Sequence, residues 1–201
     1  MKKHSLVGSV LMLLLAVLFL SGCAGSIKNM REVPAGSAEV TPDKGKAVVV
    51  FMRPSGMGFA IQSSVFEVKG DNLTLAGIVA ARMKVAYRLD PGKHLFMVIG
   101  EGADYMGAEL LPNKTYYAYV TPRMGVWKAR FSLLPVHKQE LNTPDFTDAL
   151  EGCTWVEKTS DSDNWMQENI ESIKFKHAEY YPEWMALPED ERVRLLPEDG
   201  K

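Results

Sequence analysis

The chain has 201 residues, of which 46% are hydrophobic and 24% are charged, as in folded globular proteins rather than disordered ones. Its 23 Lys and Arg residues against 25 Asp and Glu residues give a formal net charge of −2. This balance lacks the clustered basic excess of nucleic-acid-binding domains, so we expect no nucleic-acid partner. The two cysteines, Cys23 and Cys153, are too few for a disulfide-dependent scaffold, so the fold must rest on an apolar core.

The first 22 residues are typical of a signal peptide. Lys2 and Lys3 form a short positive segment, and an apolar run of 15 residues follows from Leu6 to Leu20. As a helix this run would span about 22 Å, which is shorter than the roughly 30 Å hydrocarbon core of a bilayer. The pattern therefore favours a secretion signal over a membrane-spanning helix.

The signal segment ends in Leu20-Ser21-Gly22-Cys23, which resembles the bacterial lipobox of an aliphatic residue, two small residues and a cysteine. The resemblance implies cleavage between Gly22 and Cys23, a diacylglycerol on the Cys23 thiol and a further acyl chain on the new amino group. Several acyl chains together make a nearly permanent anchor. Ala24 at the next position favours the outer membrane of a two-membrane cell, with the protein facing the periplasm. The alternative is an ordinary signal peptide that contains a cysteine.

Residues 23–45 comprise the cysteine and a segment rich in Gly, Ser, Pro and scattered charges, which predicts a flexible tether. Residues 46–158 then show short β-like runs separated by turns such as Asp90-Pro91-Gly92-Lys93. About seven closely spaced strands predict a mainly β domain, an antiparallel β-sandwich. The strands are expected at 46–53, 63–68, 73–78, 84–89, 94–100, 115–120 and 127–134.

Two glycine-rich segments are interpreted as connections between these strands. In GEGADYMG at 100–107 the glycines loosely resemble a dinucleotide-binding loop. The third glycine is misplaced for that motif and no helix follows, so we expect a surface loop. PSGMGF at 54–59 is interpreted as a second flexible connection.

Helical patterns begin near the end of the β domain. TPDFTDALEG predicts a short helix with Thr143 as N-cap, Pro144 at its first position and Gly152 at its end. CTWVEK, which follows, favours one more strand.

Residues 159–201 are expected to form a helical extension. Apolar and aromatic positions recur there at steps of three and four, which predicts an amphipathic helix that packs on the sandwich; they are Met166, Ile170, Ile173, His177 and Tyr180. We expect this helix to end near Tyr181, because Pro182 follows. LPEDERVRLL predicts a last short helix that opens at Pro188.

Three motifs of the β segment resemble a family of periplasmic lipoproteins of unknown function. They are VVVFMRP at the end of the first strand, LDPGKHLFMV around the proline turn, and PNKTYYAYV. The resemblance covers about residues 46–136 and implies a transthyretin-like or PEGA-type β-sandwich, of the transthyretin/immunoglobulin-like class. The family offers no catalytic residues to transfer to this chain.

The sequence contains no motif for a catalytic nucleophile, and its histidines lack metal-ligand spacing. His94, His137 and His177 lie far apart, and Cys153 has no Cys-x-x-Cys partner, which favours a buried structural thiol. We therefore expect no catalytic residue, no metal and no cofactor. An envelope hydrolase would have only loop residues such as Glu101 and Asp104 to offer.

The expected function is a lipid-anchored, non-enzymatic interaction module of the cell envelope, with a membrane contact through Cys23 and a protein partner. The alternative is a glycan- or peptidoglycan-binding module. Its candidate stacking residues are Tyr117, Tyr119 and Trp127, because exposed aromatic rings can stack on sugars or anchor a partner. Aromatic packing within the core is the competing interpretation of these residues.

Overall fold

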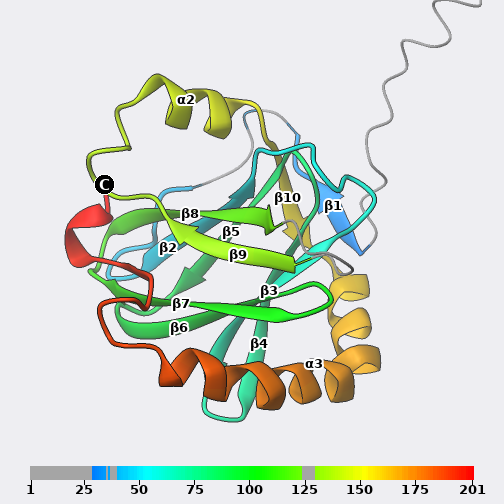
Figure 1. Cartoon of the computed structure of the whole chain (residues 1–201). Coiled ribbons are helices and arrows are strands. Elements are labelled where there is room, and N and C mark those ends of the chain that lie inside the picture. Colours follow the sequence, from blue (N-terminus) through cyan, green and yellow to red (C-terminus); the bar gives the residue numbers. More distant parts are fainter. Residues whose placement is uncertain (1–28, 35, 37–39, 124–129) are drawn as a thin grey trace, which may run out of the picture.

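The computed structural model describes residues 29–34, 36, 40–123 and 130–201. In that part of the chain the protein is mainly β, with two mixed sheets and a long C-terminal helix (Figure 1). One sheet has six strands, in the order β1 (Met30–Glu32), β10 (Thr154–Lys158), β5 (Met83–Leu89), β2 (Ala47–Arg53), β8 (Lys114–Arg123) and β9 (Arg130–Pro135). The other has five, in the order β11 (Arg194–Leu195), β7 (Ala103–Leu110), β6 (Gly92–Ile99), β3 (Ser63–Lys69) and β4 (Asn72–Val79).

The expected antiparallel arrangement is wrong for three pairs of strands. β2 pairs with β8, β10 with β5, and β11 with β7 in parallel. In each pair the strands are separated along the chain by other elements, since parallel strands cannot be joined by a tight turn. The antiparallel pairs include β3 with β4 and β6 with β7, which are hairpins.

Strand β2 lies at the centre of the molecule, and all seven of its residues are buried. One face contributes to the core between the two sheets. There the rings of Phe51 and Phe96 make an edge-to-face contact, with their centroids 5.0 Å apart. The opposite face, with Val48 and Val50, packs under α2 (Pro144–Glu151) together with Phe146. Burial on both faces explains why the strand reads as a continuous apolar run.

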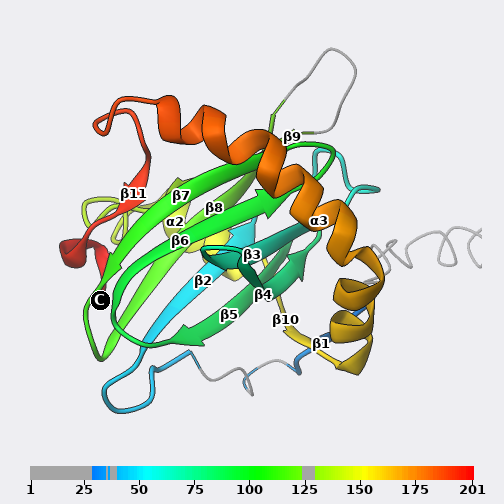
Figure 2. The same ribbon diagram turned by 90° about the horizontal axis from the view of Figure 1, so that it is seen from below.

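Helix α3 (Ser160–Ala186) crosses the outer face of the five-stranded sheet (Figure 2). Ile173 is buried, and Trp165, Met166 and Tyr180 pack against the core, as the amphipathic pattern predicts. The expected end near Tyr181 is wrong, because the helix continues through Pro182 to Ala186. Proline removes one backbone hydrogen bond. The packing of the Tyr181 and Trp184 rings on Tyr105 compensates by holding the last turn in place.

Two further sequence expectations are corrected by the structure. Most of GEGADYMG is not a loop but forms β7, and LPEDERVRLL is not a helix. It contributes β11 instead, because the Gly107 amide donates to the carbonyl of Val193 at 3.0 Å and draws this segment to the sheet edge. A 3-10 turn (Pro197–Asp199) follows. The predicted caps of α2, Thr143 and Gly152, are confirmed.

Candidate functional site

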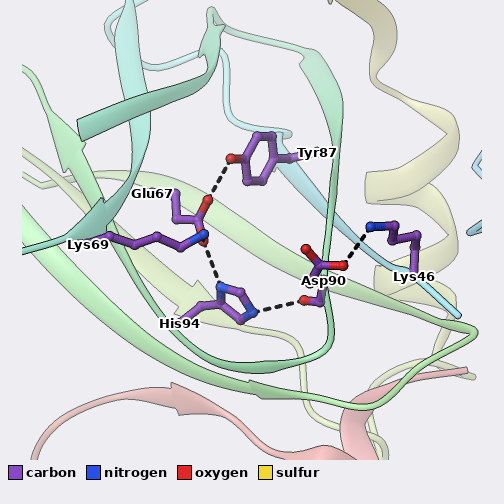
Figure 3. A network of polar contacts seen from close by, with 6 residues as sticks. All are labelled: Lys46, Glu67, Lys69, Tyr87, Asp90 and His94. Carbon is purple, nitrogen blue, oxygen red and sulfur yellow. Dashed lines mark hydrogen bonds and ion pairs between the residues drawn. The ribbon is translucent and has the colours of Figure 1, made fainter. Parts of the chain in front are cut away.

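A buried carboxylate connects the two sheets through a network of polar contacts (Figure 3). Glu67, on β3, is 4% exposed. The Tyr87 hydroxyl on β5 donates to its Oε2 at 2.7 Å, and His94 Nδ1 on β6 lies 2.7 Å from its Oε1. Lys69 Nζ approaches the same Oε1 at 2.9 Å. Hydrogen bonds and ion pairs of this kind are what a carboxylate requires in order to remain charged when buried.

The electrostatics of the network favour a charged carboxylate and a neutral phenol. Burial alone would raise the pKa of Glu67, but the hydrogen bonds from Tyr87, Lys69 and His94 outweigh burial and hold this pKa below its usual value. Burial, together with the hydrogen bond to Glu67, raises the pKa of Tyr87 well above its usual value. Tyr87 is therefore a hydrogen-bond donor at every physiological pH.

Both ring nitrogens of His94 are engaged within the protein. Nδ1 faces Glu67, and Nε2 lies 2.9 Å from the backbone carbonyl of Asp90, which can only accept a hydrogen bond. Asp90 is in turn paired with Lys46 at 2.6 Å. A general base needs a nitrogen that is free to take a proton from a substrate, and this geometry provides none. The network therefore acts as a clamp between the sheets.

A second histidine fixes α3 to the five-stranded sheet. His177 Nδ1 lies 3.0 Å from the Tyr105 hydroxyl on β7, and its ring packs on Tyr181. Burial lowers the pKa of His177, so the ring is neutral at physiological pH. His137 pairs instead with Asp199 of the C-terminal 3-10 turn, with Nδ1 and Oδ2 3.0 Å apart. Within the described ranges no group of three His, Cys, Asp or Glu side chains is arranged to hold a metal ion.

The structure does not gather the sequence-predicted site residues into one place. The lipid-attachment and cleavage residues, Gly22 and Cys23, and the aromatic Trp127 lie outside the described residues. Tyr117 is only 4% exposed, and its ring packs on that of Phe146 in α2, with the ring centroids 5.0 Å apart. Tyr119 is half-buried against the same cluster. A sugar therefore cannot stack on Tyr117 while α2 is in place.

The remaining cysteine, Cys153, has a free thiol that is 4% exposed, as expected for a structural residue. Burial raises its pKa, although the nearby Lys84 ammonium partly opposes this effect. A thiol with a raised pKa is a poor nucleophile at neutral pH, because the thiolate is the reactive form.

A loop between β2 and β3, residues 54–62, is held by a buried arginine that the sequence analysis did not single out. Arg53 is completely buried, and its guanidinium donates to the carbonyls of Ile61, Met57 and Gly58 at 2.6–2.8 Å. The guanidinium also lies over the Phe131 ring, 4.7 Å from its centroid. The carbonyl dipoles replace water around the buried charge, and in return the charge fixes the course of the loop.

This Arg53-held loop carries three exposed apolar side chains: Met57 is 54%, Phe59 71% and Ile61 39% exposed. The sequence signal for this arrangement is that residues 54–62, which follow Arg53, contain no carboxylate that could pair with it. We define residues 54–62 as the candidate contact loop.

No protein-family model matches the chain, and no curated protein matches its sequence. The resemblance to periplasmic lipoproteins therefore stays a prediction. Among the described residues, no helix combines the length and the apolar character needed to cross a bilayer.

Proposed function

We propose that this protein is a lipid-anchored component of the bacterial envelope, fixed to a membrane by Cys23, and that its folded part is a non-enzymatic interaction module. The observation that carries the proposal is Leu20-Ser21-Gly22-Cys23 directly after an apolar run of 15 residues. We assign the domain to the β-sandwich class, because two sheets enclose one core. Ala24 favours the outer membrane, facing the periplasm.

The start of the fold supports a close association with the membrane. β1 begins at Met30, and its residues pair with β10 at the edge of the six-stranded sheet. Only residues 24–29 separate Met30 from Cys23. Fully extended, that stretch spans at most about 25 Å. An anchored protein would therefore keep its domain next to the bilayer surface.

A glycan-binding function has less support. It requires aromatic rings that are open to a sugar face, whereas Tyr117 lies under α2 and Tyr119 is half-buried. Sedimentation of the protein with purified sacculi tests this alternative directly, and an absence of binding would reject it.

The anchor is tested by mass spectrometry of the full-length protein produced in a two-membrane bacterium. We expect an N-terminal peptide that starts at Cys23 and carries a diacylglyceryl thioether and an acylated amine. Cys23→Ser should abolish the modification and, with it, the stable attachment of the protein to the membrane. Cys153→Ser is the matched control, since it removes the other cysteine and should leave the lipid unchanged. An intact N-terminus with a bare Cys23 thiol would contradict the proposal.

The interaction module is tested by mild crosslinking of the anchored protein in intact envelopes, followed by purification. One envelope protein should be recovered reproducibly with the parent chain. A consistently empty result would argue against a protein partner, whatever the outcome for the anchor.

A further inference from the structure

The candidate contact loop has an unusual composition for a surface loop. Residues 54–62 read PSGMGFAIQ, without a single charged side chain, and the three largest apolar residues are the exposed Met57, Phe59 and Ile61. Isolated exposed apolar residues are common, but an uncharged cluster of them at one loop tip marks a contact surface.

The loop lies on the side of the molecule where the chain enters the fold. In both Figure 1 and Figure 2 it projects on the same side as β1, away from the C-terminus. The strand register agrees: Arg53 pairs with Met83, and Met83 pairs with Thr154. β1 lies beside β10 in the sheet, with Met30 opposite Lys158. Arg53 and Met30 are therefore separated by three strand spacings of about 4.8 Å and by four residues of about 3.3 Å along the strands, which together give about 20 Å.

We infer that the candidate contact loop inserts its apolar side chains into the surface of the membrane to which Cys23 is anchored. This inference rests on the proposed lipid anchor. With at most about 25 Å of chain between Cys23 and Met30, and the base of the loop about 20 Å from Met30, an anchored domain holds the loop within about 45 Å of the anchor, and rotation of the domain about this short connection brings the loop to the bilayer surface. A lipid surface accepts an uncharged tip of Met, Phe and Ile side chains without requiring a complementary pocket.

The internal structure of the loop suits it to an apolar environment. Backbone groups that enter an apolar region without a partner are costly. Here the carbonyls of Met57, Gly58 and Ile61 already accept hydrogen bonds from Arg53, and the Ile61 amide donates to the Gly58 carbonyl at 2.9 Å. The loop is also formed in advance, so insertion requires little ordering.

The test measures vesicle binding by the unlipidated chain 24–201, which contains every described helix and strand. Vesicles of phosphatidylethanolamine and phosphatidylglycerol are sedimented at increasing lipid concentration. We expect binding that salt hardly changes, since the loop carries no charge. The double variant Met57→Ser/Phe59→Ser should bind at least about tenfold more weakly, because binding scales with buried apolar area.

Phe175→Ser is the matched control. Phe175 lies on α3 and is 69% exposed, close to the 71% of Phe59, but it lies outside the loop. Its variant should bind within about twofold of the parent. Circular dichroism and urea unfolding of both variants establish that the fold is retained.

Binding of the double variant equal to that of the parent, or no binding by the parent, would overturn the inference. Crosslinking from position 60 to an envelope protein, with no vesicle binding, would assign the loop to a protein partner and overturn it too. Because this chain lacks Cys23, the result is independent of acylation. A bare Cys23 thiol would reject the anchor, whereas an acylated protein whose loop variant binds normally would reject the loop inference alone.

Discussion

Tyr87 on β5 donates its hydroxyl hydrogen to Glu67 on β3 over 2.7 Å, and this hydrogen bond joins the six-stranded sheet to the five-stranded sheet. The two strands belong to different sheets, so the contact spans the core between them. Glu67 is 4% exposed and would be costly to bury alone. The donors of the network therefore offset the cost of burying this carboxylate.

Replacing Tyr87 with Phe should lower the free energy of unfolding by about 1–2 kcal/mol. The variant removes one donor to a charged acceptor and leaves the ring packing intact. Urea denaturation measures the difference. Tyr119→Phe is the control, because within the described residues its hydroxyl makes no hydrogen bond and its removal should cost less than about 0.5 kcal/mol. Equal losses for the two variants would contradict the clamp.

Glu67 should make stability depend on acid pH. Its pKa is lowered in the folded state from the ordinary value of 4.5, so the unfolded chain takes up a proton at a higher pH than the folded chain. The stabilisation is complete above pH 4.5 and is lost as the pH falls through the folded pKa. Glu67→Gln should be less stable at neutral pH and should lose this part of the slope in urea midpoints measured from about pH 6 to pH 3.

Glu109→Gln provides the comparison for this pH experiment. Glu109 lies on β7 and is exposed, and its side chain is not part of the network. Its variant should keep the pH profile of the parent. A Glu67→Gln profile that parallels the parent's over the whole range would show that the network does not govern acid stability.

Most strand positions could be predicted from the sequence, with β1, β7 and β11 as the exceptions, but the pairing of the strands could not. The run that ends at Arg53 is β2, and Thr143 caps α2 as its pattern indicates. The parallel pairing of Val49 with Tyr116 joins segments more than 60 residues apart, and no local pattern encodes it. Turn residues report which segments are neighbours in the chain, which favours antiparallel hairpins in any prediction.

Two glycines of GEGADYMG show how a turn signal can mislead. Gly102, in the bend before β7, and Gly107, within β7, suggested a loop, yet both lie where another element comes close. A Cβ at Gly102 would be 3.4 Å from the Tyr180 ring, and one at Gly107 would be 3.5 Å from the Cβ of Arg194. Glycine within a strand often marks such an approach, but the approaching element is distant in sequence. The candidate contact loop was missed for a different reason: the acceptors of Arg53 are near in sequence, but they are backbone carbonyls, which every residue carries and which leave no mark in the sequence.

Gly77→Ala should destabilise the protein by about 1–3 kcal/mol through overpacking. Gly77 lies on β4 opposite β5, and a Cβ there would be 2.9 Å from both γ-carbons of Val85. Thermal or urea unfolding measures the loss. In a Val85→Ala background, Gly77→Ala should lower the free energy of unfolding by less than it does in the parent, because the γ-carbons that the new methyl group would contact are then absent. Gly56→Ala, whose nearest side-chain neighbour is 3.9 Å away, is the control.

Additive effects of Gly77→Ala and Val85→Ala would show that the two positions do not compete for space. An unfolding free energy for Gly77→Ala within about 0.5 kcal/mol of the parent would mean that the sheets separate easily at this point.

Arg53→Lys should loosen the candidate contact loop while keeping a positive charge at its base. A lysine ammonium cannot reproduce the planar fork that serves the carbonyls of Met57, Gly58 and Ile61, nor the guanidinium stacking on Phe131. We expect a loss of about 2–4 kcal/mol in unfolding free energy. Chymotrypsin should also cleave after Phe59 faster than in the parent, because loop openings become more frequent.

Arg82→Lys is the matched control for this prediction, because Arg82 precedes β5 and is exposed, whereas Arg53 is completely buried. It should change the unfolding free energy by less than about 0.5 kcal/mol and leave the cleavage rate at Phe59 unchanged. If Arg53→Lys cleaved at the parental rate and unfolded at the parental urea midpoint, the carbonyl bonds would not be what fixes the loop. The exposure of Met57 and Phe59 would then need another cause, since side chains of a loop that could move freely would turn toward the core to escape water.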